Sequence, residues 1–310
     1  MNNFNNSNAP AHVAGNTLGR SFARPRLLIV GCGDVGMRLL PLVRGRFRVF
    51  AVTSQPERQA ELRAAGAVPI VADLDQPGTL RRLAHLARYV LHLAPPPGHG
   101  SLDTRTRNLC AILPEGVRLT YVSTSGVYGD CGGALIDECR PLAPTNPRAR
   151  RRVDAETVLR AWALQRHARV SILRVPGIYA RDRLPLKRLE QGTPALIAEH
   201  DVFTNHIHAD DLARALARAL FKGLPGRAYN AVDDTHMKMA DYFDTVADAF
   251  AMQRPPRLPR EQLRALVSPV LLSFMSESRR LCNHRLKREL GLRLRYPDLV
   301  AAVAALAVQA

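Results

Sequence analysis

Leu27-Leu28-Ile29-Val30-Gly31-Cys32-Gly33-Asp34-Val35-Gly36 is the stretch that decides the fold of this 310-residue chain. Four apolar residues predict a short buried strand, and the spacing of the three glycines predicts a tight turn into a helix. Gly31 allows the bend, Gly33 lets a pyrophosphate approach the backbone, and Gly36 lets the helix pack closely on the strand. The free amides at the start of the helix favour an anion there. We therefore expect residues 31–36 to bind a dinucleotide, NAD(H) or NADP(H).

Apolar runs continue to alternate with segments of helical period through residues 24–179. We expect strands at 27–30, 48–52, 68–71, 89–93, 117–122 and 170–175. Helices are expected between them, at 37–44, 57–65, 79–87, 102–113 and 153–166. This alternation predicts a Rossmann-type α/β fold, a doubly wound parallel sheet with the ligand crevice at the carboxyl ends of its strands.

The chain divides into three parts by this pattern. Residues 1–23 predict a disordered N-terminal extension, because they are rich in Asn, Gly and Ala and lack a long apolar run. Residues 24–179 form the expected NAD(P)-binding Rossmann domain. Residues 180–310 predict a smaller, mainly helical substrate lobe with helices at 210–221, 239–250, 260–271 and 297–308. Short strands are expected near Phe203 and Tyr229, and some of these segments are expected to return to the main sheet.

The composition is strongly basic, with a formal net charge of +17 from 44 Lys and Arg against 27 Asp and Glu. The arginines are scattered along the sequence, with one dense run at 148–152, and no zinc-finger spacing or basic–aromatic interleaving accompanies them. We therefore expect an anionic small-molecule substrate and no nucleic-acid partner. Nucleic-acid binding through the arginines stays as an alternative, which predicts a steep salt dependence.

The five cysteines form no Cys-x-x-Cys pair. This pattern predicts neither a disulfide framework nor a metal site, and it fits a reduced, cytoplasmic setting. No run of 18 apolar residues is present, so we expect no transmembrane helix and no membrane partner.

The end of the second strand bears on the choice between NAD and NADP. A carboxylate there would hold the ribose 2′-hydroxyl of NAD. This chain has Thr53 and Ser54 instead, with Arg58 shortly after them. That combination favours a 2′-phosphate and hence NADP, and the alternative is that Arg58 is an ordinary surface residue.

Two further turns are expected at the cofactor. Asp73 and Leu74 follow the third strand, where the chain would reach the adenine, although Asp73 could instead cap a helix. Leu93, Ala94 and Pro95 follow the fourth strand, where small or rigid residues would border the dinucleotide.

Beyond these turns the chain resembles the extended short-chain dehydrogenase/reductase superfamily, of the NAD-dependent epimerase/dehydratase type. The resemblance rests on the glycine turn, on 71–74 (VADL), 122–129 (VSTSGVYG) and 173–179 (LRVPGIY), and on 205–212 (NHIHADDL) and 285–291 (RLKRELG). These motifs imply that Ser123, Pro176 and Ile178 also border the cofactor.

The resemblance implies a catalytic hydroxyl at Thr124, four residues before Tyr128. That hydroxyl would bond a substrate oxygen, and the alternative is that Thr124 caps the loop after its strand. The family's base is a Tyr with a Lys four residues later, and the aligned positions hold Arg148 and Arg152. An arginine stays protonated and cannot act as that base.

Three interpretations of the altered centre stay open. Tyr128 could turn toward the cleft and replace the missing Tyr, or it could be a packed aromatic of its loop. Arg148 and Arg152 could hold a phosphate or carboxylate, or they could lie on a solvated helix face. The C-terminal stretch 274–283 is similar to atypical members of the superfamily that lack the Tyr and are described as nucleoside-diphosphate-sugar epimerases.

The resemblance therefore implies an NAD(P)-binding, epimerase/dehydratase-like oxidoreductase with a non-standard active site. Its expected substrate is a nucleotide sugar or another anionic small molecule, and the resemblance implies a homodimer. The alternative is a non-catalytic NAD(P)-binding sensor or assembly protein that has lost the base.

Overall fold

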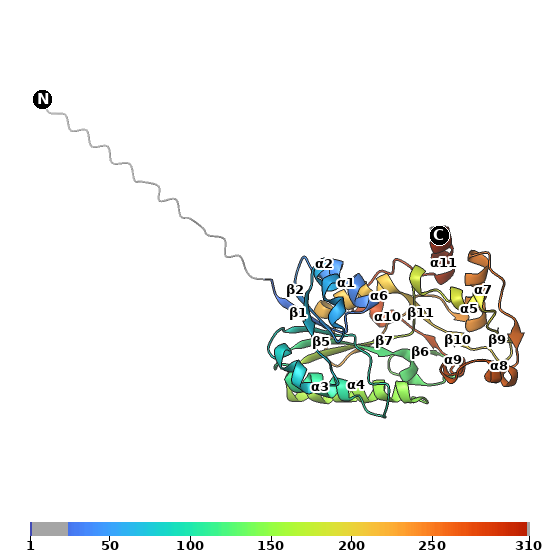
Figure 1. Cartoon of the computed structure of the whole chain (residues 1–310), viewed down its shortest axis with the longest axis horizontal. Coiled ribbons are helices and arrows are strands. Elements are labelled where there is room, and N and C mark those ends of the chain that lie inside the picture. The colour runs from blue at the N-terminus through green and yellow to red at the C-terminus, as the bar shows by residue number, and fades with distance from the viewer. Residues whose placement is uncertain (2–23, 309–310) are drawn as a thin grey trace.

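The computed structural model describes Met1 and residues 24–308 (Figure 1). The extension expected at 1–23 therefore lies, apart from Met1, outside the described residues. The main sheet has seven strands in the order β12-β7-β5-β4-β1-β2-β3, and every pair in it is parallel. Its strands are β1 (Arg26–Val30), β2 (Arg48–Thr53), β3 (Val68–Val71), β4 (Tyr89–His92), β5 (Arg118–Thr124), β7 (Arg169–Val175) and β12 (Ala228–Asn230).

Helices cover both faces of this sheet (Figure 1). One layer holds α1 (Asp34–Val43), α2 (Gln59–Ala64) and α6 (Ala209–Lys222), and the other holds α3 (Thr104–Ile112) and α4 (Pro147–Gln165). Alternate residues of β1 pack against the two helix layers, because successive side chains of a strand point to opposite faces of the sheet. Leu27 and Ile29 pack into the core with α1 and α6, whereas Leu28 and Val30 pack into the core with α3 and α4.

A smaller lobe, where the sequence analysis expected the substrate to bind, lies beyond the carboxyl ends of the main strands (Figure 1). It is assembled on four two-stranded pairs, β8 with β11, β9 with β14, β10 with β13, and β6 with β15. Their bounds are β6 (Leu135–Ile136), β8 (Gly177–Tyr179), β9 (Ala195–Leu196), β10 (Phe203–Thr204), β11 (His206–His208), β13 (Met237–Lys238), β14 (Arg257–Leu258) and β15 (Arg280–Leu281). The remaining helices are α5 (Leu186–Glu190), α7 (Met239–Ala249), α8 (Arg260–Leu266), α9 (Pro269–Phe274), α10 (His284–Arg288) and α11 (Leu299–Val308).

The expected doubly wound sheet is confirmed, and three of the expected helices are corrected. The helix expected at 79–87 is a 3₁₀ helix over Pro77–Leu83. The helix expected at 153–166 already begins at Pro147, because the Asn146 side chain accepts a hydrogen bond from the Ala149 amide and caps it. The helix expected at 260–271 is two helices, since Ser268 caps a second one that starts at Pro269.

The short strand expected near Tyr229 is β12, which lies in the main sheet beside β7. The chain therefore returns from the lobe to the sheet, and α6 before it packs on α1. Within residues 24–308, no helix is long and apolar enough to cross a membrane.

Candidate cofactor and catalytic site

A cavity of about 370 Å³ opens at the carboxyl ends of β1, β2, β3 and β4. It brings together most of the residues that the sequence predicted for the cofactor. Those residues are Gly31, Cys32, Gly33, Thr53, Ser54, Arg58, Asp73, Leu74, Leu93, Ala94 and Pro95. Val30, Val52, Gln55, Ala72 and Arg105 line it as well, although the sequence analysis did not single them out.

The three glycines of the turn have three different physical reasons to be glycine. Gly31 has φ +86°, and a Cβ there would lie 2.6 Å from the Ala94 nitrogen. A Cβ on Gly36 would lie 2.9 Å from the Cys32 sulfur, so this glycine lets α1 pack on the turn. A Cβ on Gly33 would meet nothing within 4 Å. Gly33 borders the cavity, so the space beside it is open to a ligand.

The first turn of α1 begins directly after Gly33, with Asp34, Val35 and Gly36. The amides of a helix's first turn have no partner within the helix, so they are available to an anion in the crevice. The Asp34 carboxylate is bound by Arg38 at 2.9 Å and Arg183 at 3.0 Å. These pairs offset the charge that would otherwise oppose an anion at this helix end.

Arg38 also joins the sheet domain to the lobe. Its guanidinium contacts Asp182 at 2.7 Å and Asp210 at 3.0 Å, in addition to Asp34. One side chain of α1 is therefore bonded to a lobe turn and to the start of α6.

Cys32 lies within the glycine turn. Burial raises the pKa of its thiol to about 11, so this sulfur stays protonated.

Arg58 lies against the glycine turn at the end of β2. Its Nη1 donates to the Cys32 carbonyl at 2.7 Å, and its Nε donates to Glu61 at 2.9 Å. Thr53 uses its hydroxyl locally, accepting from the Gln55 amide at 3.1 Å. The arginine is therefore held at the rim of the cavity, next to the Ser54 and Gln55 that line it.

Asp73 shapes the next wall of the cavity. Its backbone amide donates to Thr79, and its carboxylate accepts from the Asp75 amide at 2.9 Å. Arg105 closes this wall by an ion pair with Asp75 at 2.6 Å and a hydrogen bond to the Pro95 carbonyl. No sequence signal pointed to Arg105, because it comes from α3 and reaches the cavity only through the fold.

The predicted catalytic hydroxyl, Thr124, ends β5 and is half-buried. It accepts a hydrogen bond of 3.3 Å from the Gly126 amide, so the loop-capping role is present in the structure. The hydroxyl proton of Thr124 can still be donated, since the bond to Gly126 uses an oxygen lone pair. Ser123 is buried, and its hydroxyl donates to Glu156 at 2.7 Å.

Tyr128 is fully buried, which corrects the idea that it turns toward the cleft as a base. Its hydroxyl donates to Asn230 at 2.7 Å and accepts from Arg174 at 2.9 Å. Burial raises the pKa of Tyr128 to about 12. Tyr128 is therefore a packed aromatic tied into a polar network, as the second of the two interpretations held.

Arg148 and Arg152 diverge along α4. Arg148 is an exposed residue whose guanidinium carbon lies 4.2 Å from the centre of the Phe274 ring, and partial burial of the guanidinium lowers its pKa. Arg152 turns toward the sheet, where its Nη1 donates to the Val122 carbonyl at 2.6 Å and to the Tyr121 hydroxyl at 3.0 Å. In this structure the two arginines therefore do not form a joint clamp for one anion.

A buried carboxylate that the sequence analysis did not single out lies next to Arg148. Glu277 is 8% exposed, and it accepts hydrogen bonds from Thr145 at 2.5 Å, Asn146 at 3.3 Å and Arg279 at 2.8 Å. These bonds hold the segment after α9 against the start of α4. The sequence could not show this, because more than 130 residues separate Glu277 from Thr145 and Asn146.

Six residues predicted for the cofactor do not line the cavity described above, namely Asp34, Val35, Gly36, Ser123, Pro176 and Ile178. The first three follow Gly33 at the start of α1, and Ser123 is bonded to Glu156. Pro176 connects β7 to β8, and Ile178 pairs with Ile207 of β11 while packing against the core. Among residues 24–308, no group of His, Cys, Asp and Glu is arranged to hold a metal ion, and all five cysteines are free thiols.

Comparison with known proteins supplies independent evidence. The model of the NAD-dependent epimerase/dehydratase family matches residues 27–231. A curated relative, dTDP-D-glucose 4,6-dehydratase from Homo sapiens, is 31% identical over 121 residues, which is 36% of this chain and 35% of that protein. The match therefore spans only about a third of the relative's length.

Solved structures are similar over nearly the whole chain. A conserved protein of unknown function from Silicibacter pomeroyi has a TM-score of 0.76 and 29% identity, covering 92% of this chain and 99% of its own. A UDP-glucose 4-epimerase from Thermotoga maritima, solved with UDP-glucose, has a TM-score of 0.73 and 17% identity, covering 91% and 97%. At that identity the second likeness shows a shared fold.

Proposed function

Because the chain belongs to the NAD-dependent epimerase/dehydratase family, we propose that it binds NAD(H) or NADP(H) in the glycine-turn crevice and acts on an anionic substrate of the nucleotide-sugar kind. When bound, the nicotinamide group accepts or donates a hydride. The remaining contribution comes from the chain, which binds the dinucleotide, orients the substrate and offers hydrogen bonds to its oxygens.

The open space at Gly33 carries this proposal. It lies between a turn that only glycine can make at residue 31 and the free amides that begin α1. A pyrophosphate needs both a close backbone approach and those amides. The residues present therefore fit a dinucleotide in the cavity of about 370 Å³ around Gly33.

We propose NADP(H) as the preferred form, because Arg58 and Ser54 line the cavity where an NAD-specific carboxylate would otherwise stand. Replacing Arg58 with Ala is expected to weaken NADPH binding by about tenfold or more, the size of one charge-assisted hydrogen bond to a phosphate. NADH binding is expected to fall less. Fluorescence titration of both cofactors measures this, with Arg63→Ala as the matched control on α2.

Arg63 is exposed and bonds only Gln59 among the described hydrogen bonds, so its loss leaves the cavity intact. An unchanged ratio of NADPH to NADH dissociation constants in Arg58→Ala would show that this arginine does not contact a 2′-phosphate.

The proposed substrate class follows from the relatives and from Thr124. The human relative is a dTDP-D-glucose dehydratase, and the structural neighbour was solved with UDP-glucose. Thr124 ends the strand next to β4 and keeps a hydroxyl proton to donate to a sugar oxygen. No phenolate stands at position 148 to take up a proton, so the chain must use a different acceptor from the family's usual Tyr.

Turnover with dTDP-glucose or UDP-glucose as probes tests the enzymatic part of the proposal. Thr124→Ala is expected to lower kcat/KM by about tenfold to a hundredfold, as for the loss of one positioned donor, and Thr124→Ser is expected to retain most of it. Equal rates in wild type and Thr124→Ala would remove Thr124 from the mechanism.

A second candidate function is a cofactor-binding protein without turnover. The observation that favours it is the surroundings of position 148, where the family has its Tyr. Arg148 packs there on Phe274, and the adjacent Glu277 already accepts three hydrogen bonds from the protein. Absence of turnover across a wide panel of sugar nucleotides, together with cofactor affinities that differ between oxidised and reduced forms, would favour it.

A further inference from the structure

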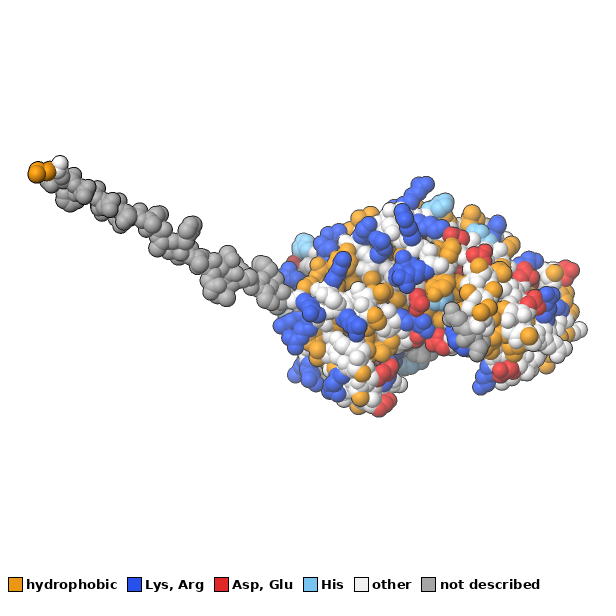
Figure 2. All heavy atoms as spheres, turned by 90° about the horizontal axis from the view of Figure 1, so that it is seen from above, with side chains coloured by type: hydrophobic (Ala, Val, Ile, Leu, Met, Phe, Trp, Pro, Cys, Tyr) orange, Lys and Arg blue, Asp and Glu red, His pale blue; other side chains and the backbone are white. Residues whose placement is uncertain are grey.

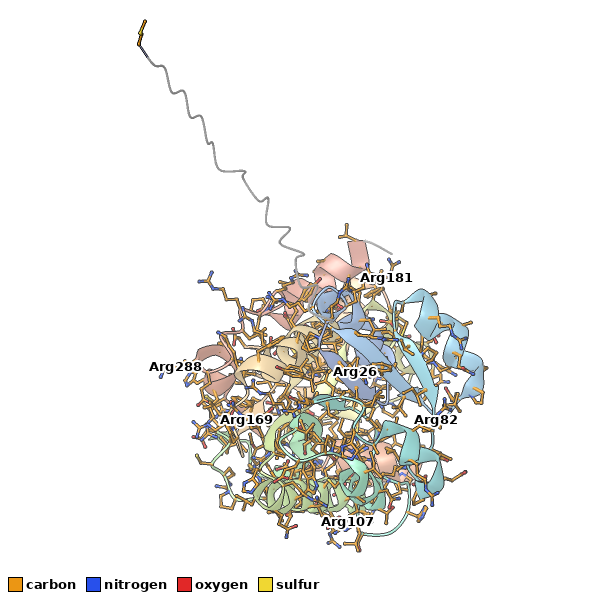
Figure 3. All side chains as sticks on the ribbon, turned by 90° about the vertical axis from the view of Figure 1, so that its left-hand side faces the viewer. Arg26, Arg82, Arg107, Arg169, Arg181 and Arg288 are labelled. Carbon is orange, nitrogen blue, oxygen red and sulfur yellow. The ribbon has the colours of Figure 1, made fainter. Side chains whose placement is uncertain are left out.

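Arginines that are scattered in the sequence gather at the amino-terminal edge of the main sheet, opposite the cofactor crevice. Because all seven strands are parallel, their first residues share this edge. Four of the strands begin with an arginine, and two more directly follow one. Among the described residues, the edge arginines without an ion pair are Arg26, Arg48, Arg88, Arg118 and Arg169, whereas Arg227, before β12, is paired with Glu289. Arg26 is paired in register with Arg48, and Arg118 with Arg169. Figure 3 faces this edge, with Arg26 and Arg169 labelled.

These edge arginines differ from those at the opposite end of the strands in having no carboxylate partners. Arg38, Arg58, Arg105 and Arg174 each form an ion pair near the crevice. Within residues 24–308 no ion pair involves the five edge arginines named above. The carboxylates nearby are few: Glu115 faces His167 at 3.7 Å, and Glu289 is taken by Arg227. The edge therefore presents positive charge without carboxylate partners. Figure 2, seen from above, shows Lys and Arg atoms in blue along the left-hand side of the folded body, where this edge lies.

Large apolar side chains are exposed at the same edge. Helices of a doubly wound fold run back toward the amino ends of the strands, so their last turns lie there. Leu42 near the end of α1, Leu164 near the end of α4 and Phe221 near the end of α6 are all exposed. Val68, the first residue of β3, and Leu224, just before β12, are exposed as well. Arginine and exposed hydrocarbon are therefore both present on this surface.

Two hollows at this edge have the same mixed lining. The larger, of about 730 Å³, is walled by Arg24, Arg26, Arg44 and Arg48 over Phe47 and Val68. The smaller, of about 380 Å³, lies between α1 and α6, where Leu42 and Phe221 meet Arg46 and Lys222. Both include Phe47, so they adjoin. Each could take a phosphate and a piece of hydrocarbon together.

We propose that the amino-terminal edge of the sheet binds the surface of an anionic phospholipid bilayer. Unpaired arginines attract lipid phosphates, and exposed leucine and phenylalanine side chains gain by entering the boundary of the acyl region. A nucleic acid would satisfy the arginines but would leave the apolar side chains in water. Two further arginines, Arg44 and Arg166, are the C-terminal caps of α1 and α4, where a positive charge interacts favourably with the helix dipole. The helix dipole therefore explains these two arginines, but it does not explain the arginines that begin the strands.

The proposal concerns a protein that lies on the membrane, not one that spans it. It therefore replaces the expectation of no membrane partner, which rested on the lack of a long apolar run. It is also independent of the proposed function, since the cofactor crevice is at the opposite ends of the strands and would remain open to water.

Co-sedimentation of the full chain with lipid vesicles tests the proposal. Binding is expected to vesicles of phosphatidylcholine with about one third phosphatidylglycerol, to weaken as salt is added, and to be absent with phosphatidylcholine alone. The double variant Arg26→Gln/Arg48→Gln is expected to bind about thirtyfold more weakly, at about 1 kcal/mol for each arginine. Leu42→Gln should weaken binding at high salt, where the apolar contribution remains.

The matched control is Lys187→Gln/Arg264→Gln, which removes two exposed basic side chains from α5 and α8 of the lobe without changing the edge. It is expected to bind vesicles as the wild type does, apart from the small effect of net charge. Equal binding to neutral and anionic vesicles, no binding to either, or equal losses in the edge and lobe variants would each overturn the proposal. Tighter binding to duplex DNA than to anionic vesicles would overturn it as well, in favour of a nucleic-acid partner.

Discussion

Replacing Gly33 with Val is expected to lower the affinity for NAD(P)H by about a hundredfold or more, which is roughly 2.7 kcal/mol. The branched side chain would occupy the open space beside α1 that a pyrophosphate needs. The folded protein itself loses little, because a Cβ at this position meets no atom within 4 Å. The backbone there is extended, with φ −83° and ψ −155°, so a β-branched residue fits it.

Two other glycines make this prediction specific. Gly45→Val is the matched control, since a Cβ at Gly45 is equally unobstructed, and Gly45 lines the hollow at the opposite edge of the sheet and not the crevice. Its cofactor affinity should equal that of the wild type. Gly31→Ala is expected to unfold the domain rather than block it, because a methyl group would overlap the Ala94 backbone at a positive φ. Fluorescence titration and thermal unfolding, measured on all three variants, separate the two effects.

If Gly33→Val bound the cofactor as tightly as the wild type, the dinucleotide would have to bind elsewhere. The proposed function would then fail at its first step. The same variant with normal unfolding and no binding would support it, because the only change is a side chain placed in the cavity.

The parallel sheet could be predicted because its strands are short, apolar on both faces and separated by helical segments. The glycine turn could be predicted for a similar reason, because the pattern of strand, glycines and helix is complete within residues 27–36. The close approach of Ala94 to Gly31 is a distant contact that this pattern does not show. Arg58 could be predicted as well, because it follows the second strand closely in the sequence. Arg105 could not be predicted, since it reaches the cavity from α3.

Local signals also explain the misplaced helices. Asn146 and Ser268 both cap helices through their side chains, and each is followed by a proline at the first helical position. The periodic pattern of apolar residues does not register these caps. The prediction from that pattern therefore began α4 too late and treated α8 and α9 as a single helix.

The polar interior could not be predicted from single positions. Ser123, Glu156 and Arg174 belong to three different elements, and nothing in their spacing shows that they meet. The same is true of the arginine edge. Arg26, Arg48 and Arg169 lie far apart in the sequence, and only the parallel order of the strands brings them to one side of the molecule.

Removing the Glu156 side chain is expected to destabilise the protein by about 3–5 kcal/mol, the cost of leaving a buried charge without its partner. Glu156 and Arg174 are 2% and 4% exposed and lie 2.8 Å apart. Glu156 also accepts the Ser123 hydroxyl, while Arg174 donates to Tyr128 and to the Glu138 carbonyl. In Glu156→Ala the guanidinium keeps only neutral partners, and Ser123 loses its acceptor.

Urea unfolding at neutral pH measures this loss, and a second variant identifies its cause. In Glu156→Leu/Arg174→Met both charges are replaced by hydrocarbon of similar size, so much of the stability should return even though the ion pair is gone. The exposed pair of Asp248 and Arg254, only 2.7 Å apart, is the control. Asp248→Ala should leave the unfolding midpoint almost unchanged, because water replaces the carboxylate at the surface.

The position of this pair links stability to the candidate active site. Ser123 immediately precedes Thr124, and Tyr128 ends the turn that Thr124 caps. If the buried pair holds this loop in place, Glu156→Leu/Arg174→Met should fold stably. Its turnover should still be lower than that of the wild type, because Thr124 is then positioned less well. If the double variant recovered neither stability nor cofactor binding, the ion pair itself, and not the uncompensated charge, would be what the fold requires at this point.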